Sequence, residues 1–67
     1  MKVNVKTIRR LMAENLYTQQ GLADVAGVTR ATINGTLLKG SCSAPTVGKI
    51  AQAFGVKPIE IIEQEEE

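Results

Sequence analysis

Four short segments of this 67-residue sequence each begin with a residue that can cap a helix, and this division restricts the chain to few folds. In each segment apolar residues recur at helical spacing, and the capping residues are Asn4, Thr18, Thr29 and Ser43. Gly27 and Gly55 can end two of the segments, because glycine readily adopts the left-handed conformation that closes a helix. The sequence therefore predicts an all-α chain of short helices.

The first and last of these segments have the clearest helical pattern. From Val5 to Leu16 one apolar stripe is formed by Ile8, Leu11, Met12 and Leu16. Val3, which precedes the cap, can pack on Ile8 as a hydrophobic staple. The segment after Ser43 has Pro45 in its first turn and an apolar stripe formed by Val47, Ile50, Ala51 and Phe54. We expect both to be amphipathic helices.

The two middle segments are shorter and lie close together in the sequence. The segment after Thr18 has room for about two turns before Gly27. The next helix is expected to begin at Arg30, directly after its cap Thr29. Two short helices joined by such a turn form a helix-turn-helix arrangement. Its expected core residues are Leu22, Ala23, Ala26, Val28 and Ile33.

The stretch from Thr32 to Leu37 favours a different structure when it is considered alone. It places Asn34-Gly35 among β-branched residues, which is the strongest short-range signal for a β-hairpin. The surrounding order favours a helix instead, since two capped helices precede this stretch and an amphipathic helix follows it. We therefore predict that Asn34 and Gly35 lie in the third helix. Whether they end it early stays open.

The C-terminal part of the sequence changes in character after Gly55. Val56 and Lys57 are a connector, and Pro58 can open a last short helix that includes Ile59 and Ile62. The sequence thus predicts five short helices over residues 1–63. Residues 64–67 are expected to be an acidic, disordered tail.

Charge is distributed unevenly along the chain. All eight lysines and arginines lie before position 60, so residues 1–59 carry a net charge of +6 and the last eight residues a net charge of −5. A basic body with an acidic tail suits a polyanionic partner such as nucleic acid.

Composition also excludes several classes of function. The sequence has no histidine and one cysteine, Cys42, so an internal disulfide and a zinc site of cysteines and histidines cannot form. We expect no metal, no cofactor and no catalytic residues, because no hydroxyl has an evident base. No apolar run approaches the roughly 20 residues of a membrane span, and no signal-peptide core is present. We therefore expect a cytoplasmic protein, with no membrane contact and no small-molecule ligand.

Residues 17–33, YTQQGLADVAGVTRATI, resemble the signature of the phage repressor and Cro type (XRE-like) helix-turn-helix family. That signature has an apolar residue and Thr-Gln, then Leu-Ala, then Ala-Gly-Val, a capping Ser or Thr, and a β-branched pair. Residues 49–56, KIAQAFGV, are similar to the fourth helix of the family and its exit. The resemblance covers roughly residues 5 to 63. It implies a compact five-helix bundle with a helix-turn-helix, in which the third helix lies in the DNA major groove and the second crosses the phosphate backbone.

The family's DNA contacts carry over to specific positions of this sequence. The resemblance implies that Gln19 and Thr29 contact phosphates. It also implies that four residues of the third helix face the bases, namely Arg30, Ala31, Asn34 and Gly35. The predicted DNA-binding residues are Thr18, Gln19, Thr29, Arg30, Ala31, Thr32, Asn34 and Gly35. Relatives commonly bind two half-sites as dimers. A homodimer of this chain on DNA would use its own helices, with residues 54–62 as the candidate interface.

The residue types at the base-facing positions suit direct readout only in part. Arg30 can donate two hydrogen bonds to guanine, and Asn34 can pair with the edge of adenine. Ala31 could touch a thymine methyl group, whereas Gly35 has no side chain with which to contact a base. We therefore expect backbone contacts and DNA shape to carry much of the specificity.

The sequence departs from the family at one buried pair. The family usually ends the third helix with an acidic residue that pairs with an arginine of the first helix, and the corresponding residues here are Leu37 and Met12. We expect an apolar contact in place of the ion pair, a change that is often neutral or stabilising.

The function that this resemblance implies is sequence-specific binding of double-stranded DNA by a transcriptional regulator of the phage or bacterial repressor kind, without enzyme activity. The alternative is a protein-interaction module of the same fold, such as an antitoxin-like or anti-repressor protein that binds a partner.

Overall fold

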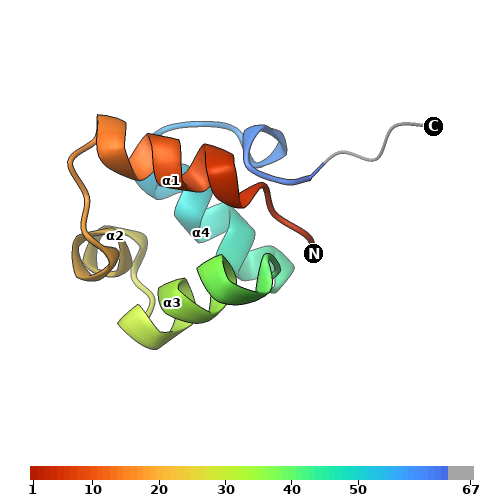
Figure 1. Cartoon of the computed structure of the whole chain (residues 1–67), viewed down its shortest axis with the longest axis horizontal. Helices are drawn as coiled ribbons and strands as arrows, with labels where there is room; N and C mark the ends of the chain where they lie inside the picture. The colour runs from red at the N-terminus through yellow and green to blue at the C-terminus, as the bar shows by residue number, and fades with distance from the viewer. Residues whose placement is uncertain (64–67) are drawn as a thin grey trace.

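The computed structural model describes residues 1–63, which form four α-helices and one 3-10 turn (Figure 1). The elements are α1 (Val5–Glu14), α2 (Gln19–Ala26), α3 (Arg30–Lys39), α4 (Ala44–Phe54) and η1 (Pro58–Glu60). The all-α prediction is confirmed, but the predicted fifth helix is only a 3-10 turn of three residues. The predicted disordered tail, residues 64–67, lies outside the described residues.

Each predicted capping residue caps the helix expected of it. The side-chain oxygens of Asn4, Thr18, Thr29 and Ser43 accept hydrogen bonds from backbone N–H groups three residues later, at distances of 3.0, 2.9, 3.1 and 3.4 Å. Gly27 and Gly55 end α2 and α4 in the left-handed conformation, with φ of 75° and 71°. These local hydrogen bonds account for the agreement between the predicted and observed helix starts.

The third helix runs without a break through Asn34 and Gly35, so the hairpin alternative is wrong. Ile33 and Leu37 are four residues apart on this helix, and both are buried in the core. The Thr36 hydroxyl donates to the carbonyl oxygen of Thr32 at 2.8 Å, which satisfies a buried polar group. Burial of one helix face thus outweighs the local hairpin preference of Asn-Gly.

The first helix is shorter than predicted, because it ends at Glu14. Leu16 lies beyond the helix, has a φ of 57° and is 91% exposed, so its assignment to the apolar stripe is wrong. Tyr17 N–H donates to the carbonyl of Met12 at 2.8 Å, and Leu16 N–H donates to that of Ala13 at 3.2 Å. This pair of bonds is the Schellman motif, with leucine at the position that glycine usually occupies.

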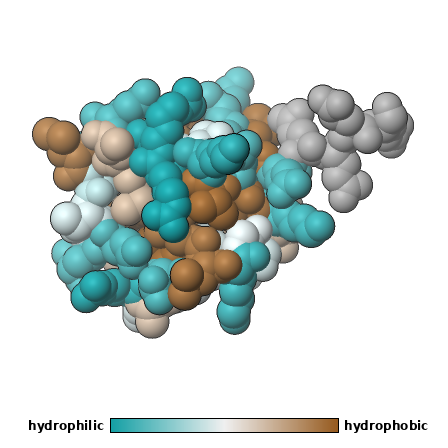
Figure 2. All heavy atoms as spheres, in the orientation of Figure 1, coloured by the Kyte–Doolittle hydropathy of each residue, from teal (hydrophilic) through white to brown (hydrophobic). Residues whose placement is uncertain are grey.

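One buried cluster joins all four helices and the C-terminal segment. Its members are Val3, Ile8, Leu11, Met12, Leu22, Ala23, Ile33, Leu37, Val47, Ile50, Ala51, Phe54 and Ile61. Met12 and Leu37, at the positions of the family's ion pair, are both buried members of this cluster. In Figure 1, α1 and α3 lie on opposite sides of α4, and Figure 2 shows apolar atoms between polar side chains on this face.

The C-terminal contribution to the core differs from the predicted one. Ile61 is fully buried, whereas Ile59 is 55% exposed and Ile62 is only partly buried. The predicted helical spacing of Ile59 and Ile62 fails because the chain leaves η1 after one turn. Of the core residues predicted for the helix-turn-helix, Ala26 and Val28 are half-buried.

The N-terminal residues form an extended segment that the sequence did not predict. Lys2 pairs with Ser41 and Val3 with Ile62 in isolated antiparallel bridges. Val3 N–H donates to the Gly40 carbonyl at 2.9 Å, and Asn4 N–H donates to the Ile61 carbonyl at 2.7 Å. The segment thus ties the end of α3 to the residues after η1.

Candidate nucleic-acid interface

The α2 and α3 helices pack against each other through a tight turn at residues 27–29. Gly27 and Val28 both donate backbone hydrogen bonds to the Ala23 carbonyl, at 2.9 and 3.0 Å, and this closes the end of α2. Leu22 and Ala23 from α2 and Ile33 from α3 are buried in the common core. Because one side of each helix faces the core, the opposite sides are left to solvent.

The solvent-facing side of α3 carries the residues that were predicted to face the bases. Arg30, Ala31 and Asn34 are exposed, and Gly35 is half-buried. Their spacing of one, four and five residues places them on one side of a helix. Polar groups on this side are available to an external partner, since the apolar side chains of α3 that hold it in place point the other way.

The middle of this exposed side is hollow. Apart from its chain neighbours and the nearby backbone of α3, no heavy atom lies within 4 Å of the position that a side-chain Cβ would take at Gly35. A shallow groove of about 310 Å³ runs between α3 and the start of α4, lined on the α3 side by Ala31, Thr32, Gly35, Thr36 and Lys39. The polar side chains of α3 therefore flank a region where its backbone lies near the surface.

The predicted phosphate-contacting residues lie at the starts of the two helices. Thr18 caps α2, and Gln19 is its first residue. Backbone N–H groups at a helix start favour anions, because they lack partners within the helix and carry the positive end of the helix dipole. At the start of α3, the hydroxyls of Thr29 and Thr32 lie 2.9 Å apart in a hydrogen bond. Thr32 is thus held by the cap, and its hydroxyl has less freedom for readout.

Lys39 is a candidate residue that the sequence reasoning did not select. It follows Ala31 and Gly35 at intervals of four residues, so it extends the same side of α3 by one turn. Its side chain is exposed and lines the groove beside Gly35. The four-residue spacing was available in the sequence and could have identified it.

Other kinds of site are not found in the part of the chain that the structure describes. Within residues 1–63, no three His, Cys, Asp or Glu side chains form a group that could hold a metal ion. None of the described helices is long and apolar enough to span a membrane. Cys42 is a free, half-buried thiol in the loop before α4.

Comparison with protein families shows which family the chain matches. A family model described as a Cro/C1-type HTH DNA-binding domain matches residues 7–67. No curated protein and no solved structure matched the chain.

Proposed function

Since the chain belongs to the Cro/C1-type helix-turn-helix DNA-binding family, we propose that it is a sequence-specific transcriptional regulator of the repressor or Cro kind. One observation carries this proposal. The α3 side that bears Arg30, Ala31 and Asn34 is exposed, while Ile33 and Leu37 anchor the opposite side in the core. A rigidly held helix with polar groups on its outer side has the form of a recognition helix.

In this proposal α3 enters the major groove of double-stranded DNA. The Arg30 guanidinium donates to O6 and N7 of a guanine, and the Asn34 amide pairs with an adenine. Ala31 contacts a thymine methyl group, and the open space at Gly35 lets the helix backbone approach the bases. With few base contacts, sequence-dependent DNA shape supplies part of the specificity.

The starts of α2 and α3 hold the phosphate backbone in the same proposal. Thr18 and Gln19 stand at the first turn of α2, and Thr29 stands at the start of α3. These contacts set the position of the protein on the duplex without reading sequence. A homodimer would place two copies of α3 about one turn of DNA apart. Its candidate interface is residues 54–62, where Ile59 is exposed.

Two substitutions separate base reading from backbone anchoring. We expect Arg30→Ala to weaken binding to the selected DNA site by about 1 to 3 kcal/mol and to relax the preference at one base pair. Its effect on duplex of random sequence should be smaller. We expect Gln19→Ala to weaken binding to both kinds of duplex by similar factors, with the preferred sequence unchanged. Binding-site selection followed by titration of the site, its single-base variants and random duplex measures both.

Arg9→Ala is the matched control, since it removes the same charge from the exposed side of α1. It should leave the sequence preference intact, and circular dichroism should show that all three variants fold. A preference that survives Arg30→Ala but changes with Gln19→Ala would contradict the placement of α3. A folded protein that binds no duplex would favour the alternative of a protein-interaction module.

A further inference from the structure

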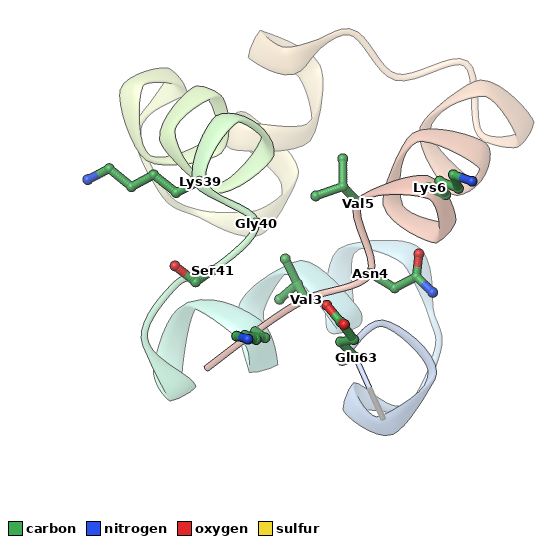
Figure 3. A pocket seen from close by; sticks show the side chains of 9 residues that line it. Val3, Asn4, Val5, Lys6, Lys39, Gly40, Ser41 and Glu63 are labelled. Carbon is green, nitrogen blue, oxygen red and sulfur yellow. The ribbon is translucent and has the colours of Figure 1, made fainter. Parts of the chain in front are cut away.

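Lys39 lines a second open groove, of about 550 Å³, in addition to the groove beside Gly35 (Figure 3). It runs between the N-terminal segment, the start of α1 and the end of α3. Among the described residues that line it, three are lysines, Lys2, Lys6 and Lys39, and one, Glu63, is acidic. We refer to these three lysines and the hollow that they border as the lysine groove.

Glu63 connects the lysine groove to the acidic end of the sequence. Its backbone N–H donates to the Lys2 carbonyl at 3.0 Å, which fixes this residue beside the N-terminal segment. In Figure 3 its carboxylate points toward the N-terminal segment near Val3, while the side chains of Lys6 and Lys39 extend outward on either side. Glu63, the first residue of the acidic stretch 63–67, is therefore held at the groove itself.

The residues that follow are complementary in charge to the lysines. Gln64 is followed by three glutamates, Glu65, Glu66 and Glu67. Four extended residues span about 13 to 14 Å, and they start from Glu63, which itself lines the hollow together with the three lysines. Lys39 is also the last residue of α3 and extends its proposed DNA-facing side. A carboxylate and a DNA phosphate would thus compete for the same ammonium group.

We propose that the acidic segment, residues 63–67, binds the lysine groove of its own chain and competes there with the DNA backbone. Each exposed ion pair contributes little, so the contact is readily displaced by a duplex with many phosphates. The segment then lowers the affinity for DNA of any sequence without altering base preference. The competition rests on the proposed DNA-binding function, whereas the contact between the acidic segment and the groove does not.

The contact is tested first in the absence of DNA. We expect the variant Glu65→Gln/Glu66→Gln/Glu67→Gln to shift the backbone amide NMR signals of Lys6, Lys39 and Ser41 at low salt. These residues are far from the substitutions in sequence, so a shift reports contact through space. About 1 M salt should remove the difference between variant and parent, because the Debye length there is about 3 Å.

The control variant Glu14→Gln/Asp24→Asn removes one carboxylate from α1 and one from α2. Neither residue lines the groove. It should leave the signals of Lys6, Lys39 and Ser41 in place. Unchanged groove signals in the tail variant, or equal shifts in the control, would overturn the proposal.

Affinity for random duplex tests the competition. At low salt we expect the tail variant to bind about three- to tenfold more tightly than the parent. This gain should vanish in a Lys6→Gln/Lys39→Gln background and persist in a Lys49→Gln/Lys57→Gln background, which loses the same charge outside the groove. An equal gain in both backgrounds would mean that only net charge matters, and the competition would be refuted. If no variant binds duplex while the groove signals still shift, the DNA-binding function fails and the contact stands.

Discussion

Leu16 shows how one residue can be strained without being buried. It occupies the left-handed position of the motif that ends α1, with φ of 57°, and its side chain is 91% exposed. For residues other than glycine this conformation brings Cβ too close to the following carbonyl oxygen, at a cost of roughly 1 to 2 kcal/mol. The exposed side chain offers little apolar burial to offset that cost.

We therefore expect Leu16→Gly to stabilise the protein. The gain from relieved strain is reduced by the greater freedom of glycine in the unfolded chain, which leaves roughly 0.5 to 1 kcal/mol in the free energy of unfolding. Urea denaturation followed by circular dichroism measures this change. Leu16→Val serves as the control, because a β-branched residue is still less compatible with this conformation and should destabilise. Stabilisation by valine would contradict the assignment of strain.

Met12 and Leu37 show the replacement of two charged residues by two apolar ones at buried positions. Both lie in the buried cluster, where the resemblance to the repressor family led us to expect an ion pair to be replaced by apolar packing. An apolar pair avoids the desolvation of two charges, so its presence does not weaken the fold.

At the scale of the element, α3 combines a polar, weakly helix-forming outer side with a buried inner side. Gly35 lowers the intrinsic stability of this helix, since glycine in a helix interior costs about 1 kcal/mol relative to alanine. Burial of Ile33 and Leu37 offsets this loss. The α4 helix contains a comparable glycine, Gly48, on an element that carries no predicted base contact.

We expect Gly48→Ala to raise the free energy of unfolding by about 0.8 to 1 kcal/mol, because the added Cβ meets no heavy atom within 4 Å other than its chain neighbours and the nearby backbone of α4. For a domain of this size the midpoint of thermal unfolding should rise by about 4 to 8 °C per kcal/mol. Differential scanning calorimetry provides the measurement. A lower midpoint would mean that α4 packs more closely at Gly48 than the structure indicates.

Gly35→Ala is the matched comparison on α3, since the added Cβ again meets open space. It should stabilise the protein by a similar amount. Unlike Gly48→Ala, it should also alter DNA affinity, because it places a methyl group on the proposed base-facing side.

At the scale of the whole molecule, the N-terminal segment joins parts of the chain that are far apart in sequence. It bonds to the end of α3 on one edge and to the residues after η1 on the other. Lys2 and Lys6 are thereby placed around the same hollow as Lys39, the last residue of α3. The net charge of +6 over residues 1–59 is thus partly concentrated around the end of α3.

This charge distribution predicts a steep salt dependence of DNA binding. The logarithm of the association constant should fall linearly with the logarithm of salt concentration, by about 0.9 for each phosphate contact, because counterions are released from the duplex. Fluorescence anisotropy titrations between about 50 and 200 mM salt give the slope. Affinity that stays constant over this range would contradict the DNA-binding role.

The starts of the four helices were predictable from the sequence because they depend on neighbouring residues. Each cap accepts a hydrogen bond from a backbone N–H group three residues later, so both partners of the bond can be identified in the local sequence. The four caps are Asn4, Thr18, Thr29 and Ser43. The exposed side of α3 was likewise predictable, through the resemblance of the helix-turn-helix to a known family. That resemblance agrees with the family match over residues 7–67.

Other features depended on contacts between residues distant in sequence, and these only the tertiary structure decided. The order of the surrounding helices predicted that Asn34 and Gly35 lie in a helix, but whether they end it was left open, and burial of Leu37 in the core settles that the helix continues to Lys39. Ile61 rather than Ile59 enters the core because the chain leaves η1 to pair with the N-terminal segment. The lysine groove arises from the same pairing, since periodicity along one helix contains no information about which distant segment lies beside it.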